Sequence, residues 1–163
     1  MYQPVYFFSM SAQYKVKQIA CGGEHAFAVT RNEQVYGWGR NDSGQLGLGF
    51  IRDSVKEPYL VPSLENKSIK SIECGPDYSM VITSLRKLLV TGALEGGKLG
   101  LGRAWRQGFV QEFRQVPELS FLKSVACGPN HVIAICSTNH TKGCGIYAWG
   151  QNWRGQLGIG NKE

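Results

Sequence analysis

Two histidines follow a cysteine at the same distance, a spacing that suggests metal binding. His25 and His131 each lie four residues after a cysteine, but Tyr78 stands at the equivalent place after a third cysteine. A structural zinc site needs four converging ligands at a recognised spacing, and the chain has no Cys-x-x-Cys pair. We therefore interpret these three side chains as polar anchors inside a repeated unit, and we expect neither a metal nor a cofactor.

A glycine-rich segment, GALEGGKL at residues 92–99, comes close to the phosphate-binding pattern G-x-x-x-x-G-K-[S/T]. Leu99 replaces the hydroxyl that the pattern needs for Mg²⁺, and no helix is predicted after it to direct its N-terminus at a phosphate. The segment is also the second copy of a motif that recurs along the chain. No Ser/His/Asp triad or pair of carboxylates stands out, so the sequence predicts no enzyme and no catalytic residue.

The elements that carry these residues recur along the chain. Cys21, Cys74 and Cys127 are 53 residues apart, and so are the glycines that follow them. A period of this size indicates a repeat architecture, in which each unit buries its apolar face against its neighbours. Residues shared by all copies are structural by default, so whatever is specific to this protein should lie where the copies differ. The copies are 16–49, 69–102 and 122–160.

Each copy has the pattern of short strands separated by glycine-rich turns. In the first copy, three apolar runs (VKQIAC, AFAVT and VYGWG) precede a Pro-containing run, YLVPSL. No helical period is visible. Four-stranded units of about 50 residues are typical of propeller blades, so we predict an all-β fold of three four-stranded antiparallel blades. We expect each glycine-rich ending to cross to the next blade, with Leu46, Leu99 and Leu157 buried beneath it and Trp38 and Trp149 packed between blades.

The joint pattern of the copies is similar to a known repeat. V-x-x-V-A-C-G-x-x-H followed by V-Y-x-W-G-x-N-x-x-G-Q-L-G-x-G resembles the repeat of the regulator of chromosome condensation family, and the resemblance covers nearly the whole chain. It implies a β-propeller. It also implies a choice of roles, because propellers of this family serve as exchange factors for Ran-type GTPases, as chromatin binders and as plain interaction modules.

The number of copies departs from that family. Its propellers usually close with seven blades, and three blades cannot close a ring of this type. We therefore interpret residues 1–163 as a single partial β-propeller, an incomplete ring with repeats at approximately 1–49, 50–102 and 103–160. Two explanations stay open: the chain is part of a longer propeller, or it completes a ring with other subunits.

Composition and cysteine use bear on the compartment. No stretch approaches the ~18 apolar residues that cross a bilayer, and the N-terminal residues lack the pattern of a signal peptide. Five cysteines are present, three of them at equivalent places in separate units, where disulfide geometry is not expected. The sequence predicts a reducing compartment, cytoplasm or nucleus, and no membrane partner.

Net positive charge is confined to the second half of the chain. Residues 1–81 hold eight Lys or Arg and eight Asp or Glu, whereas residues 82–163 hold ten and four, so the whole net charge of +6 lies there. Cations beside an exposed aromatic suit phosphate and base contacts or an acidic protein surface. Ordinary solvated loop charge is the simpler alternative. The predicted partner-binding residues, all on one rim, are Lys98, Arg103, Trp105, Arg106 and Arg154.

Three functions follow in order of preference. The first is a non-catalytic protein-interaction or scaffold module, whose partner is a protein such as a small GTPase or the remainder of a propeller ring. The second, implied by the resemblance, is a guanine-nucleotide exchange factor, or part of one, for a Ran-type small GTPase. Exchange in this family is attributed to a projecting β-hairpin, and the longest insertion here, five residues, is too short for one. Binding of chromatin or DNA is third.

Overall fold

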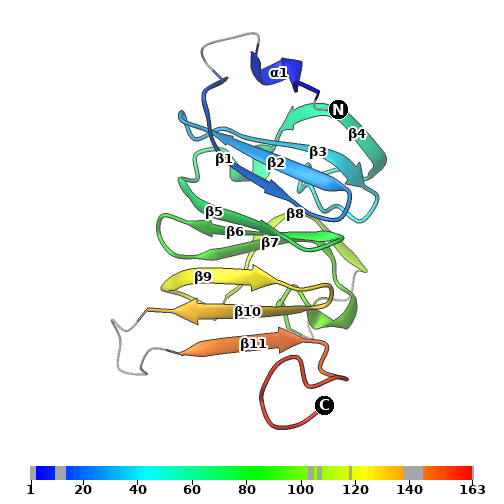
Figure 1. Ribbon diagram of the computed structural model, residues 1–163, viewed down its shortest axis with the longest axis vertical. Helices are drawn as coiled ribbons and strands as arrows, with labels where there is room; N and C mark the ends of the chain where they lie inside the picture. Colours follow the sequence, from blue (N-terminus) through cyan, green and yellow to red (C-terminus); the bar gives the residue numbers. More distant parts are fainter. Residues whose placement is uncertain are drawn as a thin grey trace.

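Three antiparallel β-sheets are stacked along the chain in a computed structural model of the protein (Figure 1). The structure describes residues 3–9, 14–102, 105, 108–117, 119–137 and 145–162. The strand orders are β1-β2-β3-β4, β5-β6-β7-β8 and β9-β10-β11. The strands are Val16–Cys21 (β1), His25–Thr30 (β2), Val35–Asn41 (β3), Arg52–Leu60 (β4), Ile69–Cys74 (β5), Tyr78–Thr83 (β6), Leu88–Ala93 (β7), Phe109–Gln115 (β8), Leu122–Cys127 (β9), His131–Cys136 (β10) and Ile146–Gly150 (β11).

Helix is nearly absent from the described part of the chain. The α-helix α1 (Tyr6–Ser9) is four residues long, and the 3-10 turns η2 (Pro62–Leu64) and η3 (Glu95–Gly97) have three residues each. Short apolar runs broken by glycine cannot sustain the 3.6-residue stripe of a buried helix, so they pair as strands. The predicted all-β fold of propeller blades is confirmed. The third sheet has three strands among the described residues, where four were predicted.

The glycine-rich motif does not lead from one sheet to the next, as the sequence had predicted. In the first sheet it joins β3 to β4, and β4 returns to pair with β3, with Tyr36 opposite Leu60. The Pro-containing turn η2 then leads to the second sheet. The prediction was wrong because β4 is mostly exposed and polar, so its sequence does not stand out as a strand.

Although this motif belongs to its own sheet, it packs on the following one. The Gly49 N–H donates to the Gln111 carbonyl of β8 at 2.8 Å, and Leu48 forms an isolated bridge with Glu112. Neighbouring sheets also meet along their first strands, because β5 contacts both β1 and β9. The first and second sheets therefore touch both along their first strands and at the glycine-rich motif. These two contacts fix the position of one blade on the next.

Two apolar cores fill the space between the sheets. The core between the first and second sheets contains Leu46 and Phe113, and the core between the second and third contains Leu99 and Val132. Leu46 and Leu99 are fully buried, as predicted. Leu157 is only half-buried, because no further sheet packs on it in the described part of the chain.

Candidate functional site

Two turns of each sheet meet along one side of the stack. At the end of the third strand, the Arg40 N–H donates to the Glu24 carbonyl at 2.8 Å in the first sheet, and the Gln151 N–H donates to the Asn130 carbonyl at 2.8 Å in the third. The second sheet repeats the bond at 3.0 Å. We call this side the rim. It comprises residues 22–24, 75–77 and 128–130 together with 39–45, 92–98 and 150–156.

On the first sheet the rim cation is paired with two carboxylates. Arg40 Nη1 lies 2.9 Å from Glu24 Oε2, and Arg40 Nη2 lies 2.7 Å from Asp42 Oδ2. The hydrogen bond from Arg40 lowers the pKa of the Asp42 carboxyl, so this group stays ionised. Partly exposed ion pairs of this kind contribute little to stability. Their effect is that the first sheet presents no uncompensated cation from this group of residues.

Lys98 does not project from the rim as the sequence had predicted. Its side chain is 1% exposed, and Nζ lies 2.8 Å from both carboxylate oxygens of Asp77. Nζ also lies 3.2 Å from Asn130 Oδ1 in the third sheet. A buried ammonium needs such partners, because its desolvation is costly. Lys98 therefore joins two sheets and is not available to a partner.

Of the four other predicted binding residues, the structure describes Trp105 and Arg154. Arg103 and Arg106 lie outside the described residues. The ring of Trp105 packs partly buried against the core between the second and third sheets, with Nε1 buried. Arg154 is exposed on the rim of the third sheet. The structure thus places Arg154 where a partner can reach it, whereas Lys98 is buried and Trp105 packs against the core.

Trp153, next to Arg154, is the exposed aromatic of this rim. It is 73% exposed, although tryptophan is usually well buried. The same turn position holds Asp42 in the first sheet and Glu95 in the second. The sequence already distinguished this position, because it is acidic in the first two copies and is a tryptophan in the third. The charge pattern drew attention to the cations instead.

The sequence had predicted that His25 is an anchor inside its own sheet. The structure shows instead that its side chain connects two sheets. Its Nε2 lies 2.8 Å from Ser79 Oγ of β6, and this hydroxyl donates to the Gln45 carbonyl at 2.7 Å. Because a hydroxyl has a single hydrogen, His25 Nε2 must donate to Ser79. Burial lowers the pKa of His25 to about 4, so its ring is neutral near pH 7.

Tyr78 repeats this connection at the next junction. Its hydroxyl donates to the Gly128 carbonyl of the third sheet at 2.8 Å. The two side chains therefore serve the same purpose with different chemistry, which explains why the position accepts either an imidazole or a phenol. Neither side chain is arranged to bind a metal.

Two of the three repeated cysteines, Cys74 and Cys127, are free thiols of low reactivity. Burial raises the pKa of both Cys74 and Cys127 to about 12, so the reactive thiolate is scarce at neutral pH. Cys21 is exposed and Cys136 is buried. Cys74 and Cys127 therefore pack at the ends of β5 and β9, the first strands of their sheets. Their thiols are unsuited to nucleophilic catalysis.

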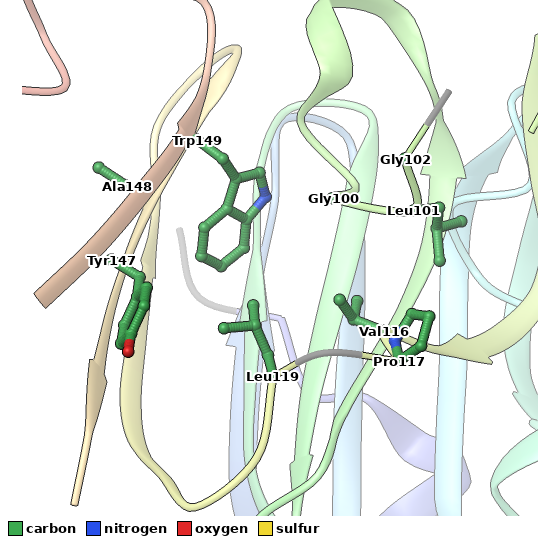
Figure 2. A pocket seen from close by; sticks show the side chains of 9 residues that line it. All are labelled: Gly100, Leu101, Gly102, Val116, Pro117, Leu119, Tyr147, Ala148 and Trp149. Carbon is green, nitrogen blue, oxygen red and sulfur yellow. The ribbon is translucent and has the colours of Figure 1, made fainter. Parts of the chain in front are cut away.

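An apolar pocket of about 400 Å³ opens beside β11 (Figure 2). Trp149 points from β11 toward Gly100, and its Nε1 donates to the Lys98 carbonyl at 2.8 Å. Trp149 thus packs between blades as predicted. Trp38, its equivalent, lies instead against Phe8 at the free face of the first sheet, with a centroid distance of 5.9 Å. The pocket offers an apolar contact area and no group suited to catalysis.

Among the described residues, no group of three or more His, Cys, Asp or Glu side chains could hold a metal ion. No helix in this part of the chain is long and apolar enough to span a membrane.

Comparisons with known proteins identify the repeat. Two models described as "Regulator of chromosome condensation (RCC1) repeat" match residues 16–45 and 32–82. The ultraviolet-B receptor UVR8 of Arabidopsis thaliana is 35% identical over 155 residues, which cover 91% of this chain and 32% of that protein. The serine/threonine-protein kinase Nek9 of Xenopus laevis is 34% identical over 159 residues, which cover 90% of this chain and 16% of that protein.

A solved structure has the same arrangement of blades. Prp20p from Saccharomyces cerevisiae, described together with its binding to Gsp1p and histones, matches with a TM-score of 0.79 at 26% identity, over 90% of this chain and 35% of that one. The chain therefore spans between 16% and 35% of the length of these three proteins. Propellers of this type are generally non-catalytic interaction modules. The repeats, the blade geometry and these likenesses agree, and the chain belongs to the regulator of chromosome condensation repeat family.

Proposed function

We propose that this chain is a non-catalytic protein-interaction module that binds its partner through the rim of the third sheet. The observation that carries the proposal is the exposure of Trp153, 73%, beside the exposed Arg154. Tryptophan and arginine are enriched among the residues that dominate binding energy at protein interfaces. The rim position they occupy also differs between copies, whereas the residues that join the sheets recur.

The charge of the second half favours an acidic partner surface. All of the net +6 lies in residues 82–163, and Arg103 and Arg106 follow the second glycine-rich motif in that half. We keep both arginines in the proposed surface. We remove Lys98, whose charge is paired with Asp77, and Trp105, whose ring packs against the core between the second and third sheets. Complementary potentials accelerate association and favour partners of opposite charge.

The partner class is proposed from the same charge together with the likeness to Prp20p. That protein was described with its binding to Gsp1p and histones. A net positive chain is repelled by basic histones, so a Gsp1p-type small GTPase is the better candidate of the two. Guanine-nucleotide exchange on such a GTPase is the alternative function, and direct binding of DNA by the cationic half is third. We place the protein in the cytoplasm or nucleus, because the three repeated cysteines, Cys21, Cys74 and Cys127, are free thiols.

The proposed surface is tested by a double substitution on the rim. Trp153→Ala with Arg154→Ala should weaken binding to a Gsp1p-type GTPase at least tenfold, or about 1.4 kcal/mol. Tyr59→Ala with Arg31→Ala removes an exposed aromatic and an exposed cation elsewhere, and should leave affinity unchanged. Calorimetric titration against the GTPase, histones and duplex DNA measures both variants, with unfolding followed separately. Equal affinities for the wild type and the rim variant would refute the surface.

The exchange alternative has a separate test. Release of a fluorescent guanine nucleotide from the loaded GTPase is followed with and without the full chain. Acceleration that the rim variant loses would make the module an exchange factor. Binding without acceleration would retain the interaction module and exclude exchange by this part of the propeller.

A further inference from the structure

The turn between β6 and β7 differs in chemistry from its counterpart in the first sheet. Leu85 stands where the first copy has Asn32, and it is 83% exposed. Arg86 stands where the first copy has Glu33. The two turns share one backbone conformation, since Arg86 has a φ of 59° and Glu33 a φ of 65°. Polar residues suit such a turn, so its shape does not account for the exposed leucine.

Arg86 also differs from Glu33 in how it joins two sheets. In the first copy, the Glu33 carboxylate accepts the Ile69 N–H at 3.1 Å and pairs with Lys17. In the second copy, the backbone carbonyl of Arg86 accepts the Leu122 N–H at 3.2 Å. The Arg86 side chain is exposed and forms no ion pair with any residue that the structure describes. Its charge can therefore meet a partner.

An aromatic side chain lies beside this turn in an unfavourable backbone conformation. Phe121, the residue before Leu122, has a φ of 61° and is 42% exposed. Bulky residues rarely adopt a positive φ, whereas glycine or asparagine would do so more easily. Ser68, the equivalent residue before β5, does not have a positive φ. Local folding therefore favours a small residue here and does not account for an aromatic one.

Hydrogen bonds hold the turn and its two neighbouring connections together. The Ser84 N–H donates to the Ser68 carbonyl at 2.8 Å, and Lys87 Nζ donates to Ser120 Oγ at 2.9 Å. We call the surface formed by residues 65–70, 84–87 and 119–123 the basal surface. It lies at the other end of the strands from the rim, because each strand runs between the two sides. A partner meets a backbone that is already ordered, which lowers the entropic cost of binding.

The basal surface is cationic, with two large apolar side chains exposed. These side chains belong to Leu85 and Phe121. The second sheet has a neighbouring sheet on each side, so this exposure does not depend on the outer faces of the first and third sheets. Positive potential favours a partner of opposite charge. One acidic residue, Glu65, accompanies five cations: Lys67, Lys70, Arg86, Lys87 and Lys123.

We propose that the basal surface binds a partner protein through a linear segment in which acidic and apolar residues alternate. The apolar residues cover Leu85 and Phe121, and a carboxylate pairs with the Arg86 guanidinium, which can hold both of its oxygens. Alternate side chains of an extended peptide can reach both apolar groups, whereas two separate side chains offer little area for insertion into a membrane. The site uses no residue of the rim and is independent of the proposed function.

The first copy supplies a variant that removes this surface and keeps the turn. Leu85→Asn with Arg86→Glu introduces the residues of the first turn, where Glu33 shows that glutamate adopts the positive φ. This turn variant should fold with a melting temperature close to that of the wild type. Lys56→Glu with Tyr59→Asn is the matched control, because it makes the same change of charge and removes an exposed aromatic on β4.

Selection from a random peptide library displayed on phage identifies the ligand class. The full chain is the bait, and the turn variant removes peptides that bind elsewhere. The selected peptides should alternate Asp or Glu with apolar residues. In fluorescence anisotropy, synthetic copies should bind the turn variant at least tenfold more weakly than the wild type or the β4 control. Added salt should weaken binding to the wild type, because charged contacts are screened.

A second variant keeps the test valid if the turn variant is unstable. Phe121→Asn lies outside the turn and places a residue that tolerates the positive φ at 61°. It should weaken peptide binding without lowering the melting temperature, a combination that a purely structural role of Phe121 would not give.

Three results would overturn the proposal. One is a selection that yields no peptide able to distinguish the wild type from the turn variant. Another is a set of selected peptides without an excess of carboxylates. The third is binding of the wild type, but not of the turn variant, to vesicles of phosphatidylserine and phosphatidylcholine while no peptide is selected. That last result would assign the basal surface to a membrane.

Discussion

Truncation of one repeated leucine gives a quantitative test of how the blades are held together. Leu46 and Leu157 occupy the same position in the glycine-rich loops 41–49 and 152–160. The N–H of each donates to the side-chain oxygen of an asparagine, Asn41 or Asn152, at 3.1 Å. They differ in what covers them: Leu46 is 0% exposed in the core between two sheets, and Leu157 is half-buried. The pair therefore separates the contribution of packing from that of the loop.

Leu46→Ala should lower the free energy of unfolding by about 3 kcal/mol, within the range for fully buried leucines. For a chain of this length, that corresponds to a melting temperature roughly 6–12 °C lower. Leu157→Ala should cost about 1 kcal/mol, because much of its side chain already contacts water. Urea denaturation followed by tryptophan fluorescence measures both variants. Equal losses at the two positions, or no loss at Leu46, would refute the assignment of Leu46 to the core between sheets.

Three further predictions follow from buried polar groups. Because burial lowers the pKa of His25 to about 4, the unfolded chain binds this proton first as pH falls, so stability should fall between pH 6.5 and 4, and His25→Gln should flatten that slope in acid titrations of unfolding. Lys98→Ala, which strands Asp77, should cost about 1–3 kcal/mol, and Lys98→Gln, the residue of the other two copies, should cost less when both are compared by denaturation. Iodoacetamide labelling read by peptide mass spectrometry should modify the exposed Cys21 well before Cys74, whose pKa is raised to about 12.

The architecture could be predicted from sequence because its signals are local and repeated. The 53-residue spacing of the cysteines and the glycine turns set the blades, and Leu46 and Leu99 were placed correctly from their position between glycines. Strand β4 was missed as a continuation of its own sheet, because exposed polar strands lack an apolar pattern. The connection through the glycine-rich motif was misjudged for the same reason.

The candidate site was harder to predict because it depends on contacts between copies. Lys98 had the composition of a surface cation, and only the proximity of Asp77 and Asn130 shows that it is buried. His25 was expected inside its own blade, since the sequence gives no indication that Ser79 of the next blade lies within hydrogen-bonding distance. Trp153 could have been found by comparing the copies position by position. Exposure of a single side chain is set by packing, which the repeat alone does not specify.

The central claim is that the shared residues join the blades and that the partner binds where the copies differ, on the rim of the third sheet. The most direct test is hydrogen–deuterium exchange of the full chain with and without a bound Gsp1p-type GTPase. We expect protection at residues 150–156, around Trp153, and unchanged exchange at residues 31–34 and 84–87 in the turns away from the rim. Protection confined to those turns, with residues 150–156 unaffected, would contradict the account.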